Sequence, residues 1–573
     1  MNSKLTLNYI LFLVLSFAII FGYSYYFGPE TKEQQATAPQ ATQNTQNTPA
    51  QSGQGTAPVT APAPVPAANT TAENVNHYEE LVRDDNGTII TVTSPLFTAK
   101  IDTLGGRVKE WLLNDYKATT AEDSPPVNVI NGEKQLITKA SVNGANIPFL
   151  IPFNYSGSTN IEITDENKGI TLSYTDPGGF TLTKTIEFEA ANYLLNQSMT
   201  IKNSSGNPIE YGLGFEAFGK IEQAGRGYDS DELIVLLDNE VEKVTSLPKQ
   251  PEQFSGQINW FGLNDKYFLA AIIPEIGGNS ALSYSSLNSN KILNAKYLYP
   301  REIINAGNES TTKWKTYIGP KESENLNVVG YGLNQAINWG WIGVLAKIML
   351  KFLKMLNSVF HNYGISIIAI TIILRVLFLP LTLKSMRSMK LMQTKMQAIK
   401  PKVDALKEKY KDDKQKQNAE LMKLYTNNGV NPLSSLGGCF PLLLQLPVFV
   451  ALYDVLLYSI DVRQSSFLWI SDLAEPEHLF NIPLVAGYEL PFRILPLLMG
   501  VSWFISTKMT PQTAPGSESM ELQMKMMQYM PIIFTVLFWS LPSGLILYWT
   551  VSNILSIFQQ IYINKTVHVA QGG

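Results

Sequence analysis

The chain has little cysteine, histidine or charge for its length. Among its 573 residues there are one cysteine, Cys439, and four histidines, which excludes an intrachain disulfide framework and leaves few ligands for a zinc or haem site. Charged residues make up 16% of the chain, against about 25% in an average soluble domain. We therefore expect no metal site and no cofactor, and we expect long uncharged segments.

The first uncharged segment is close to the amino terminus. Residues 5–27 carry no charge, follow Lys4 and are long enough to cross the ~30 Å hydrocarbon core of a bilayer. A cleavable signal peptide is the alternative, but no small-residue cleavage site of the A-x-A type follows the apolar run. The sequence therefore favours an uncleaved transmembrane anchor over residues 1–28.

The other candidate transmembrane helices all follow residue 360. The stretch between Lys525 and Lys565 has 39 uncharged residues, too many for one crossing of about 30 Å at 1.5 Å per residue. Because Pro542 and Gly544 break a helix, this stretch is predicted to form two. The total is six transmembrane helices, of which five form a core within residues 363–565: 363–383, 439–460, 491–507, 526–541 and 543–563.

The charges of the loops predict the orientation of these helices. Residues 384–423 hold 12 lysine and arginine residues against 5 acidic ones, and positively charged loops stay in the cytoplasm. The loop at 461–489 is acidic and has one basic residue, Arg463. We therefore expect both termini, the short tail at 566–573 and a helical hairpin at 384–428 to be cytoplasmic, and residues 29–340 to lie outside.

The predicted external region has two parts. Residues 29–74 are mostly Ala, Thr, Gln and Pro, a composition that cannot bury enough apolar surface to fold, so they are predicted to be a disordered linker. Residues 75–325 alternate between β-forming and polar residues, as in 180–188, and are predicted to form a large β-sandwich. This part lacks the common catalytic motifs, so we interpret it as a docking or scaffolding domain, with a sugar-binding sandwich as the alternative.

Residues 326–362 connect the predicted sandwich to the helical core. Within them, Lys347, Lys351 and Lys354 recur at helical spacing among apolar and aromatic residues that begin at Trp339. This pattern is typical of an amphipathic helix that lies in the membrane interface. A seventh transmembrane helix is the alternative, but it would place the sandwich in the cytoplasm.

Arg375 lies twelve residues into its transmembrane helix, near the middle of the bilayer. Burying an arginine at that depth costs at least about 2.5–3.5 kcal/mol, so its side chain is expected to face a partner or a watery cavity. Thr371, one turn earlier, and Gln445 and Asn553, on other helices, are candidates for the same cavity. A structural ion pair with Asp454 and ordinary hydrogen bonds between helices are the alternatives.

The predicted cytoplasmic hairpin carries methionines at helical spacing. Met386, Met389, Met392 and Met396 follow one another at intervals of 3, 3 and 4 residues, which places them on one helical face. Packing between the two hairpin helices is the simpler interpretation. An adaptable surface for unfolded apolar peptide is the alternative.

Several motifs of the core, in their order along the chain, resemble the YidC/Oxa/Alb family of membrane protein insertases. They are Asn431-Pro432-Leu433, Gly437-Gly438-Cys439-Phe440-Pro441, Gln445-Leu446-Pro447-Val448-Phe449, Pro542-Ser543-Gly544-Leu545 and Tyr548-Trp549-Thr550-Val551-Ser552-Asn553. The resemblance covers about residues 340–565. The linker and sandwich are similar to the periplasmic region of Gram-negative members of the family.

The resemblance implies a groove that is open to the cytoplasm and the lipid and closed outside. Its central arginine would be Arg375, and polar flanks of a client protein would enter it. The resemblance further implies that Thr371, Gln445, Tyr548 and Trp549 belong to the groove, beside the candidate Asn553, and that the client helix slides along an apolar surface at Leu446, Pro447, Val448, Phe449, Phe534 and Leu537. Trp549 departs from a family pattern that often has two tyrosines. No catalytic residue is implied, and the chain is not expected to be an enzyme.

The resemblance also implies partners. Nascent membrane proteins would be the clients, membrane lipids would surround the core, and the Sec translocon with its accessory subunits would act beside it. The carboxyl-terminal tail is short and has little positive charge, so contacts with the ribosome or the signal recognition particle and its receptor are expected at the hairpin. No DNA is expected. A secondary transporter and an envelope enzyme are the competing interpretations; the first lacks an inverted repeat and the second lacks a catalytic motif.

Overall fold

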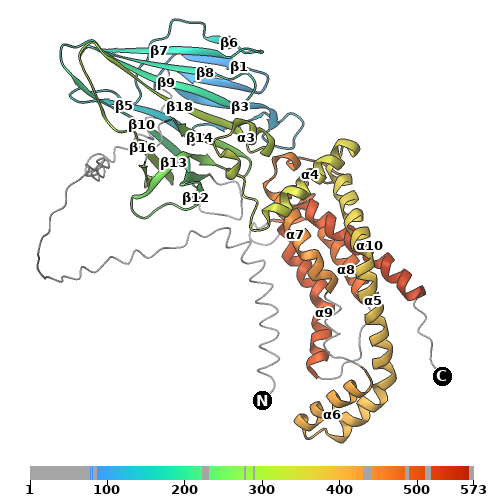
Figure 1. Ribbon diagram of the computed structural model, residues 1–573. Helices are drawn as coiled ribbons and strands as arrows, with labels where there is room; N and C mark the ends of the chain where they lie inside the picture. The colour runs from blue at the N-terminus through green and yellow to red at the C-terminus, as the bar shows by residue number, and fades with distance from the viewer. Residues whose placement is uncertain are drawn as a thin grey trace, which may run out of the picture.

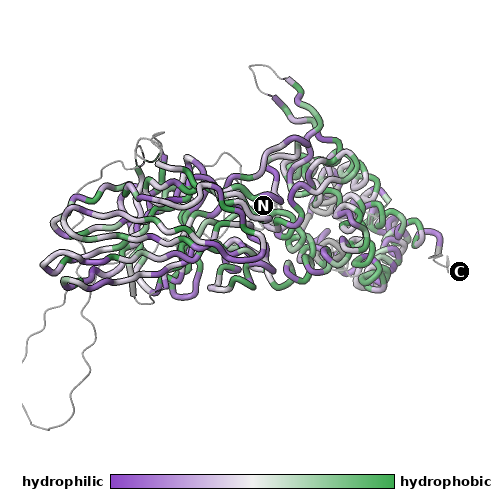
Figure 2. Tube along the Cα trace, turned by 90° about the horizontal axis from the view of Figure 1, so that it is seen from above, coloured by the Kyte–Doolittle hydropathy of each residue, from purple (hydrophilic) through white to green (hydrophobic). Residues whose placement is uncertain are grey.

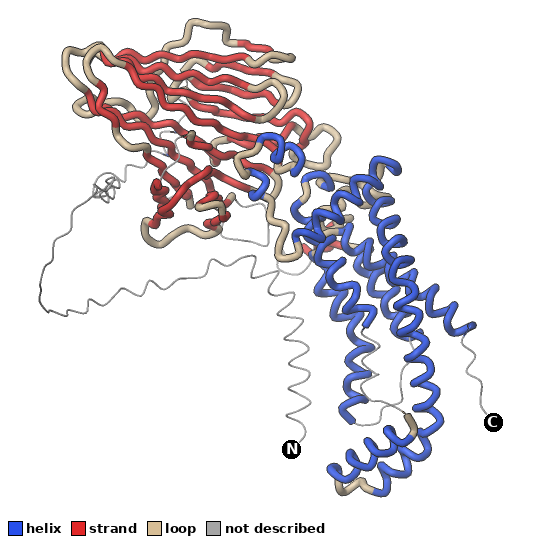
Figure 3. Tube along the Cα trace, viewed as in Figure 1, coloured by secondary structure: helices blue, strands red, loops and turns tan. Residues whose placement is uncertain are grey.

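The computed structural model describes residues 87–221, 231–275, 279–287, 291–429, 440–483, 489–509 and 518–566, together with Tyr78 and Leu81. The predicted anchor (1–28) and linker (29–74) lie outside these ranges, as do the motif residues 431–433 and 437–439 and the tail from residue 567. The described chain forms a β domain (Ile89–Pro320) and a helical domain (Tyr363–Thr566), and Figures 1 and 3 show the β domain at one end of the helical bundle.

Within the described ranges, the β domain contains a 5-stranded and a 13-stranded sheet. The smaller sheet has the order β4-β3-β2-β1-β6 and is antiparallel except for the β1–β6 pair. Its strands are β1 (Ile89–Thr93), β2 (Phe97–Asp102), β3 (Arg107–Lys117), β4 (Pro126–Ile130) and β6 (Asn160–Glu162). The larger sheet contains β5 (Lys134–Val142), β7 (Lys168–Asp176), β8 (Phe180–Phe188), β9 (Leu194–Asn203), β10 (Ile209–Lys220), β11 (Glu232–Leu237), β12 (Glu240–Val244), β13 (Glu252–Asn264), β14 (Phe268–Pro274), β15 (Asn279–Leu287), β16 (Ile292–Leu298), β17 (Glu302–Ile304) and β18 (Glu309–Pro320).

The two sheets pack face to face through alternating apolar side chains. Along β8, every second residue from Phe180 to Phe188 is buried, because successive side chains of a strand point to opposite faces. Phe97 of β2 stacks on Trp111 of β3 with ring centroids 4.1 Å apart and approaches Phe188 of β8 at 6.3 Å. These contacts between the sheets agree with a sandwich.

Lys184 interrupts this apolar face of β8. Its ammonium group is buried, donates a hydrogen bond to Thr138 Oγ1 at 3.0 Å and lies 5.7 Å from the Trp314 ring centroid. Burial lowers the pKa of Lys184 from 10.5 to about 7. Between these two values the unfolded chain holds a proton that the folded chain has released. The contribution of Lys184 to the free energy of unfolding therefore rises with pH across this window, by up to about 1.4 kcal/mol per unit.

Replacing Lys184 with methionine is expected to remove that slope. The substitution should raise the free energy of unfolding at pH 7 by roughly 3 kcal/mol. It removes the cost of deprotonating the lysine on folding, and the loss of one hydrogen bond offsets part of this gain. Denaturant unfolding of the full chain at pH 7 and pH 9.5 measures both effects. Lys202→Met, at an exposed position of the neighbouring strand β9, is the control. An unchanged pH slope in Lys184→Met would show that the lysine titrates normally.

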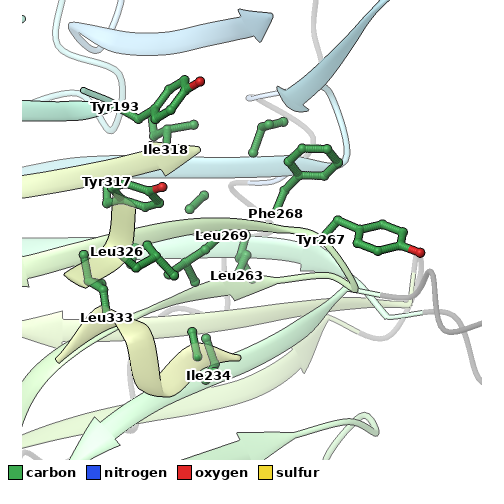
Figure 4. Close-up of a cluster of buried hydrophobic side chains, with 14 of the residues drawn as sticks. Tyr193, Ile234, Leu263, Tyr267, Phe268, Leu269, Tyr317, Ile318, Leu326 and Leu333 are labelled. Carbon is green, nitrogen blue, oxygen red and sulfur yellow. The ribbon is translucent and has the colours of Figure 1, made fainter. Parts of the chain in front are cut away.

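One edge of the sandwich is covered by the segment that leads to the helical domain. This segment contains α3 (Ser323–Val329) and the short 3-10 helix η1 (Leu333–Ala336). Leu326 and Leu333 are fully buried in the same apolar cluster as Leu263 and Leu269 of the large sheet, and Figure 4 shows Leu326 next to Leu269. The connection is thus packed onto the β domain.

The helical domain and its flanking segments form the second part of the molecule in Figure 1. Their elements are α4 (Gly343–Phe360), α5 (Tyr363–Lys409), α6 (Lys414–Asn427), α7 (Phe440–Tyr458), η3 (Ile460–Val462), the hairpin strands β19 (Phe480–Pro483) and β20 (Glu489–Phe492), α8 (Leu495–Met509), α9 (Glu518–Leu537), η5 (Phe538–Ser540) and α10 (Ser543–Thr566). Of the helices in the described ranges, α5 alone combines the length and apolar composition required to cross a membrane. α7 and α9 contain shorter apolar segments, Leu444–Tyr458 and Gln528–Ser540. The predicted total of six transmembrane helices is therefore not confirmed.

Several predicted boundaries differ from the structure. The helix expected at 363–383 continues as α5 to Lys409, so that span and the first arm of the hairpin form one helix. The helix expected at 491–507 begins at Leu495, because the preceding apolar residues pair as strand β20. The amphipathic helix begins at Gly343, after Trp339. The predicted break at Pro542 is present, since α10 begins at Ser543.

The methionine face of the hairpin packs α5 against α6. Met392 and Met396 are buried in a cluster with Ile399, Val403, Leu421 and Tyr425. For these two methionines, the simpler interpretation of packing between the two helices is therefore confirmed.

Polar contacts join the β domain to the helical domain. Lys354 of α4 forms ion pairs with Asp461 at 2.9 Å and with Glu324 of α3 at 3.1 Å. Arg463 donates a hydrogen bond to the Lys117 carbonyl of β3 at 2.8 Å. α4 and β3 thus contact the loop that follows α7, and α3 is linked to it through Lys354.

Candidate functional site

Arg375 of α5 is held by neutral acceptors from two other helices. Its Nε donates to Ser552 Oγ of α10 at 3.0 Å, and Nη2 donates to the same hydroxyl, to the Ser552 carbonyl at 2.9 Å and to Gln445 Oε1 of α7 at 3.3 Å. Gln445 Nε2 donates in turn to Ser552 Oγ at 2.7 Å. Three helices therefore converge on one guanidinium group.

The charge of Arg375 has no carboxylate partner among the described residues. Its hydrogen bonds use Nε and Nη2, and no acceptor within the described ranges bonds Nη1. The alternative of an ion pair with Asp454 is wrong. The Asp454 carboxylate lies instead beside the backbone of Gly340, where a Cβ would be 2.8 Å from Oδ2, and this oxygen has no partner in the described part of the chain. An anionic group that reached Nη1 would meet an uncompensated positive charge.

A pocket adjoins the guanidinium. Its empty space is about 360 Å³, including its open mouth. A single helical turn, about 10 Å wide and 5.4 Å high, occupies roughly 400 Å³, so the pocket is too small for a helix. It is lined by Thr371, Leu374, Arg375, Phe378, Thr382, Leu444, Gln445, Val448 and Tyr548.

The structure brings together four of the six residues expected in the groove. Thr371, Arg375, Gln445 and Tyr548 all line the pocket. Asn553 does not: its side chain is buried against α8, where Nδ2 donates to Ser502 Oγ at 3.3 Å. The reason is helical geometry, because Asn553 follows Tyr548 by five residues and so points to a different side of α10.

Trp549 also lies away from the pocket, in an aromatic cluster. Its ring centroid is 4.9 Å from Phe449, 5.3 Å from Phe538 and 5.4 Å from Trp503. Phe534 of α9 packs on Phe538 at 5.1 Å. This cluster fixes α7, α8, α9 and α10 against one another next to the pocket.

The residues expected in the sliding surface do not form one exposed face. Phe449 and Phe534 are buried in the aromatic cluster, and Val448 lines the pocket. Leu446 is half-buried, whereas Pro447 and Leu537 are exposed. On α9, Leu537 belongs to an exposed apolar face with Ile532, Ile533 and Val536. Val536 alone is 72% exposed. Of the residues expected in the sliding surface, Leu537 thus belongs to an exposed face of α9.

The end of the bundle near the β domain is closed by the loop that follows α7. The Ser543 and Gly544 amides at the start of α10 donate to the carbonyls of Glu475 and Leu473, at 2.8 and 2.9 Å. A Cβ on Gly544 would be 3.0 Å from the Leu473 carbonyl oxygen, which explains the glycine. Backbone groups that would otherwise be unpaired are thus satisfied within the loop.

Ser552 is the site residue that the sequence analysis missed. It follows Tyr548 by four residues, and this spacing places both side chains on the same face of α10. The same spacing argument would have selected Ser552 in preference to Asn553. Leu374, Phe378, Thr382 and Leu444 were also missed, and nothing in their residue types distinguishes them from ordinary helix packing.

Comparison with known proteins assigns both parts of the chain. The family described as "60Kd inner membrane protein" matches residues 355–570, and that described as "YidC periplasmic domain" matches residues 89–352. A protein of Geobacter metallireducens named "Membrane protein insertase YidC" is 33% identical over 568 residues, with 98% of each chain covered. The chain belongs to the YidC family. A second YidC relative, from Pelobacter propionicus, is 35% identical and covers 98% of this chain and 99% of its own.

A solved structure of the YidC family also matches. The crystal structure titled "Active YidC insertase crystal structure with the first transmembrane domain resolved" has a TM-score of 0.35 and 19% identity, and covers 85% of this chain and 96% of its own. The β domain of our chain corresponds to the periplasmic domain of the YidC family. In the described ranges, no group of three or more His, Cys, Asp or Glu side chains could hold a metal ion.

Proposed function

We propose that this chain is a membrane protein insertase of the bacterial inner membrane and that its clients are nascent integral membrane proteins. Its YidC relatives, named as insertases, match it over nearly the whole length. The observation that carries the proposal is Arg375, a charge in the apolar first half of α5 that has no carboxylate partner among the described residues and lies beside a pocket too small for a helix.

The pocket receives the polar flank of the client, and Arg375 attracts carboxylates in that flank. A polar segment in the pocket crosses less hydrocarbon than it would alone, which lowers the cost of its desolvation. The pocket opens to the cytoplasm and to lipid, with both termini in the cytoplasm and the β domain in the periplasm. Thr371, Thr382, Gln445 and Tyr548 provide the polar wall, and Ser552 holds the guanidinium of Arg375.

The apolar helix of the client remains outside the pocket. It slides along the exposed face of α9, which contains Leu537 and Val536, and meets the exposed Pro447 of α7. Burial of the helix in lipid drives insertion, and the membrane potential adds about 2.3 kcal/mol per charge per 100 mV for acidic flanks. No nucleotide and no cofactor are required.

The chain acts alone or beside the Sec translocon. The hairpin formed by α5 and α6 carries exposed lysines, including Lys395 and Lys402, at the end of the bundle farthest from the β domain. We assign contacts with the ribosome and with the signal recognition particle or its receptor to this hairpin, and contacts with membrane lipids to the exposed apolar faces.

Reconstitution tests the function. A short single-span protein is translated beside liposomes with and without the purified chain, and protease protection reports insertion. We expect protection well above that of empty liposomes. No gain over empty liposomes would refute autonomous insertion, and solute uptake by the same vesicles would favour the transporter interpretation.

A further inference from the structure

The strands β19 and β20 form a hairpin with one apolar and one polar face. Their register pairs Phe480 with Phe492 and Ile482 with Leu490, so these four side chains share a face. The two phenylalanine rings stack with centroids 4.9 Å apart. The apolar face is open: among the described residues, nothing covers Phe480 and Leu490, which are 53% and 41% exposed.

The opposite face of the hairpin is polar and internally bonded. Asn481 Nδ2 donates to Glu489 Oε2 at 2.6 Å, and Asn481 Oδ1 is 2.9 Å from His478 Nε2. A two-stranded hairpin is only marginally stable in water, and an exposed apolar face adds to its cost. Two such different faces indicate that the hairpin separates an apolar medium from a polar one.

The helix that follows the hairpin is short. α8 has 15 residues and extends about 22 Å, against the ~30 Å of a bilayer core. Asn553 and Ser502 are hydrogen-bonded, seven residues from the start of α8 and ten from the start of α10. The first turn of α8 is therefore about 4–5 Å nearer the middle of the membrane than that of α10.

The hairpin consequently leaves the bundle at the level of the membrane surface. Figure 2 shows its strands projecting from the side of the bundle. Its apolar face is continuous in sequence with the exposed apolar side chains at the start of α8, Ile494, Leu497 and Leu498. Pro483 and Pro491 lack amide hydrogens, which reduces the number of unpaired donors that the strands bring toward lipid.

Aromatic and basic residues mark the same level. Arg493, next to the hairpin, donates to the Trp539 carbonyl of η5, which follows α9. Trp469 is 44% exposed and donates to Glu477. Tryptophan is enriched at both membrane–water interfaces.

We propose that the β19–β20 hairpin lies in the outer interface of the membrane, with Phe480, Ile482, Leu490 and Phe492 in contact with the lipid acyl chains. Asn481 and Glu489 face water. The hairpin extends the short helix α8 sideways into the outer leaflet and holds the outer end of the bundle at a fixed depth. This inference rests on the proposed function in one respect: the proposed orientation decides which end of the bundle is outside.

Fluorescence quenching by lipid tests the proposal. In a Cys439→Ser background, single cysteines at Phe480 and at Asn481 carry an environment-sensitive fluorophore, and the full chain is reconstituted in phosphatidylethanolamine and phosphatidylglycerol vesicles. Lipids with a nitroxide on the acyl chain should quench the label at 480 severalfold more than the label at 481. A water-soluble quencher should show the opposite order.

A second apolar position is the control for local misfolding caused by the label. Leu490→Cys should behave as Phe480→Cys does, whereas equal quenching at 480, 481 and 490 would overturn the proposal. Shielding from water at 480 without lipid quenching would also overturn it, because protein would then cover the apolar face. The same vesicles are used in the insertion assay, so lipid quenching without insertion would reject autonomous insertion and retain this inference.

Discussion

Replacing Arg375 with alanine is expected to slow the insertion of clients with acidic flanks about tenfold. Two unit charges 4 Å apart interact with about 4 kcal/mol at an effective dielectric constant of 20. Arg375 is only partly buried, and the screening by water that follows reduces this to roughly 1–2 kcal/mol, which corresponds to about a tenfold change. Clients with neutral flanks should lose much less. Protease protection in liposomes, measured as an initial rate, compares the two client types.

Ser552→Ala separates the charge of Arg375 from its surroundings. This substitution removes the hydroxyl that accepts from Nε and Nη2 but leaves the Ser552 carbonyl and Gln445 as acceptors. The positive charge remains, so acidic clients should insert faster in Ser552→Ala than in Arg375→Ala. Arg375→Lys, which keeps the charge without the planar donor geometry, should restore part of the rate.

Two outcomes would contradict the role of the charge. If acidic and neutral clients slow equally in Arg375→Ala, the arginine supports the structure of the pocket and does not attract the client. If Ser552→Ala is as slow as Arg375→Ala, the hydrogen-bond network, and not the charge, limits the rate.

Sequence analysis placed the arginine in the bilayer but could not choose its partner. The distance of Arg375 from the start of its helix gives its depth, since the rise per residue is fixed. Its partners depend on how α5, α7 and α10 are rotated against one another, which a single sequence does not contain. Asp454 was therefore a reasonable alternative, although its carboxylate lies beside Gly340.

The same limit applies to the apolar residues. Phe449, Phe534 and Leu537 are all apolar residues of the helices α7 and α9, and hydrophobicity alone does not tell a buried residue from an exposed one. In the structure, Leu537 is exposed while both phenylalanines are buried in the aromatic cluster. The hairpin strand β20 was read as the start of a transmembrane helix for a related reason, because a short apolar run fits a strand or a helix.

Replacing Gly262 with alanine is expected to destabilise the β domain severely. Gly262 lies in β13 and pairs with Ala271 of β14. A Cβ at this position would overlap the Ala270 carbonyl oxygen and lie 2.6 Å from Ala271 Cα. These are backbone atoms in the middle of the large sheet, which cannot move without separating the two strands. We expect a loss of about 3 kcal/mol in the free energy of unfolding, the upper end of the range that overpacking of a well-packed core produces.

Gly206→Ala is the matched control for this substitution. Gly206 is exposed in the turn between β9 and β10, has nothing within 4 Å of a Cβ position, and does not have a positive φ. Its replacement should leave stability unchanged or raise it by about 0.4–1 kcal/mol, because alanine restricts the unfolded chain. Denaturant unfolding of the full chain, followed by near-ultraviolet circular dichroism, compares the two variants with the wild type. Equal stability of Gly262→Ala and Gly206→Ala would mean that β13 and β14 are not paired as closely as this register requires.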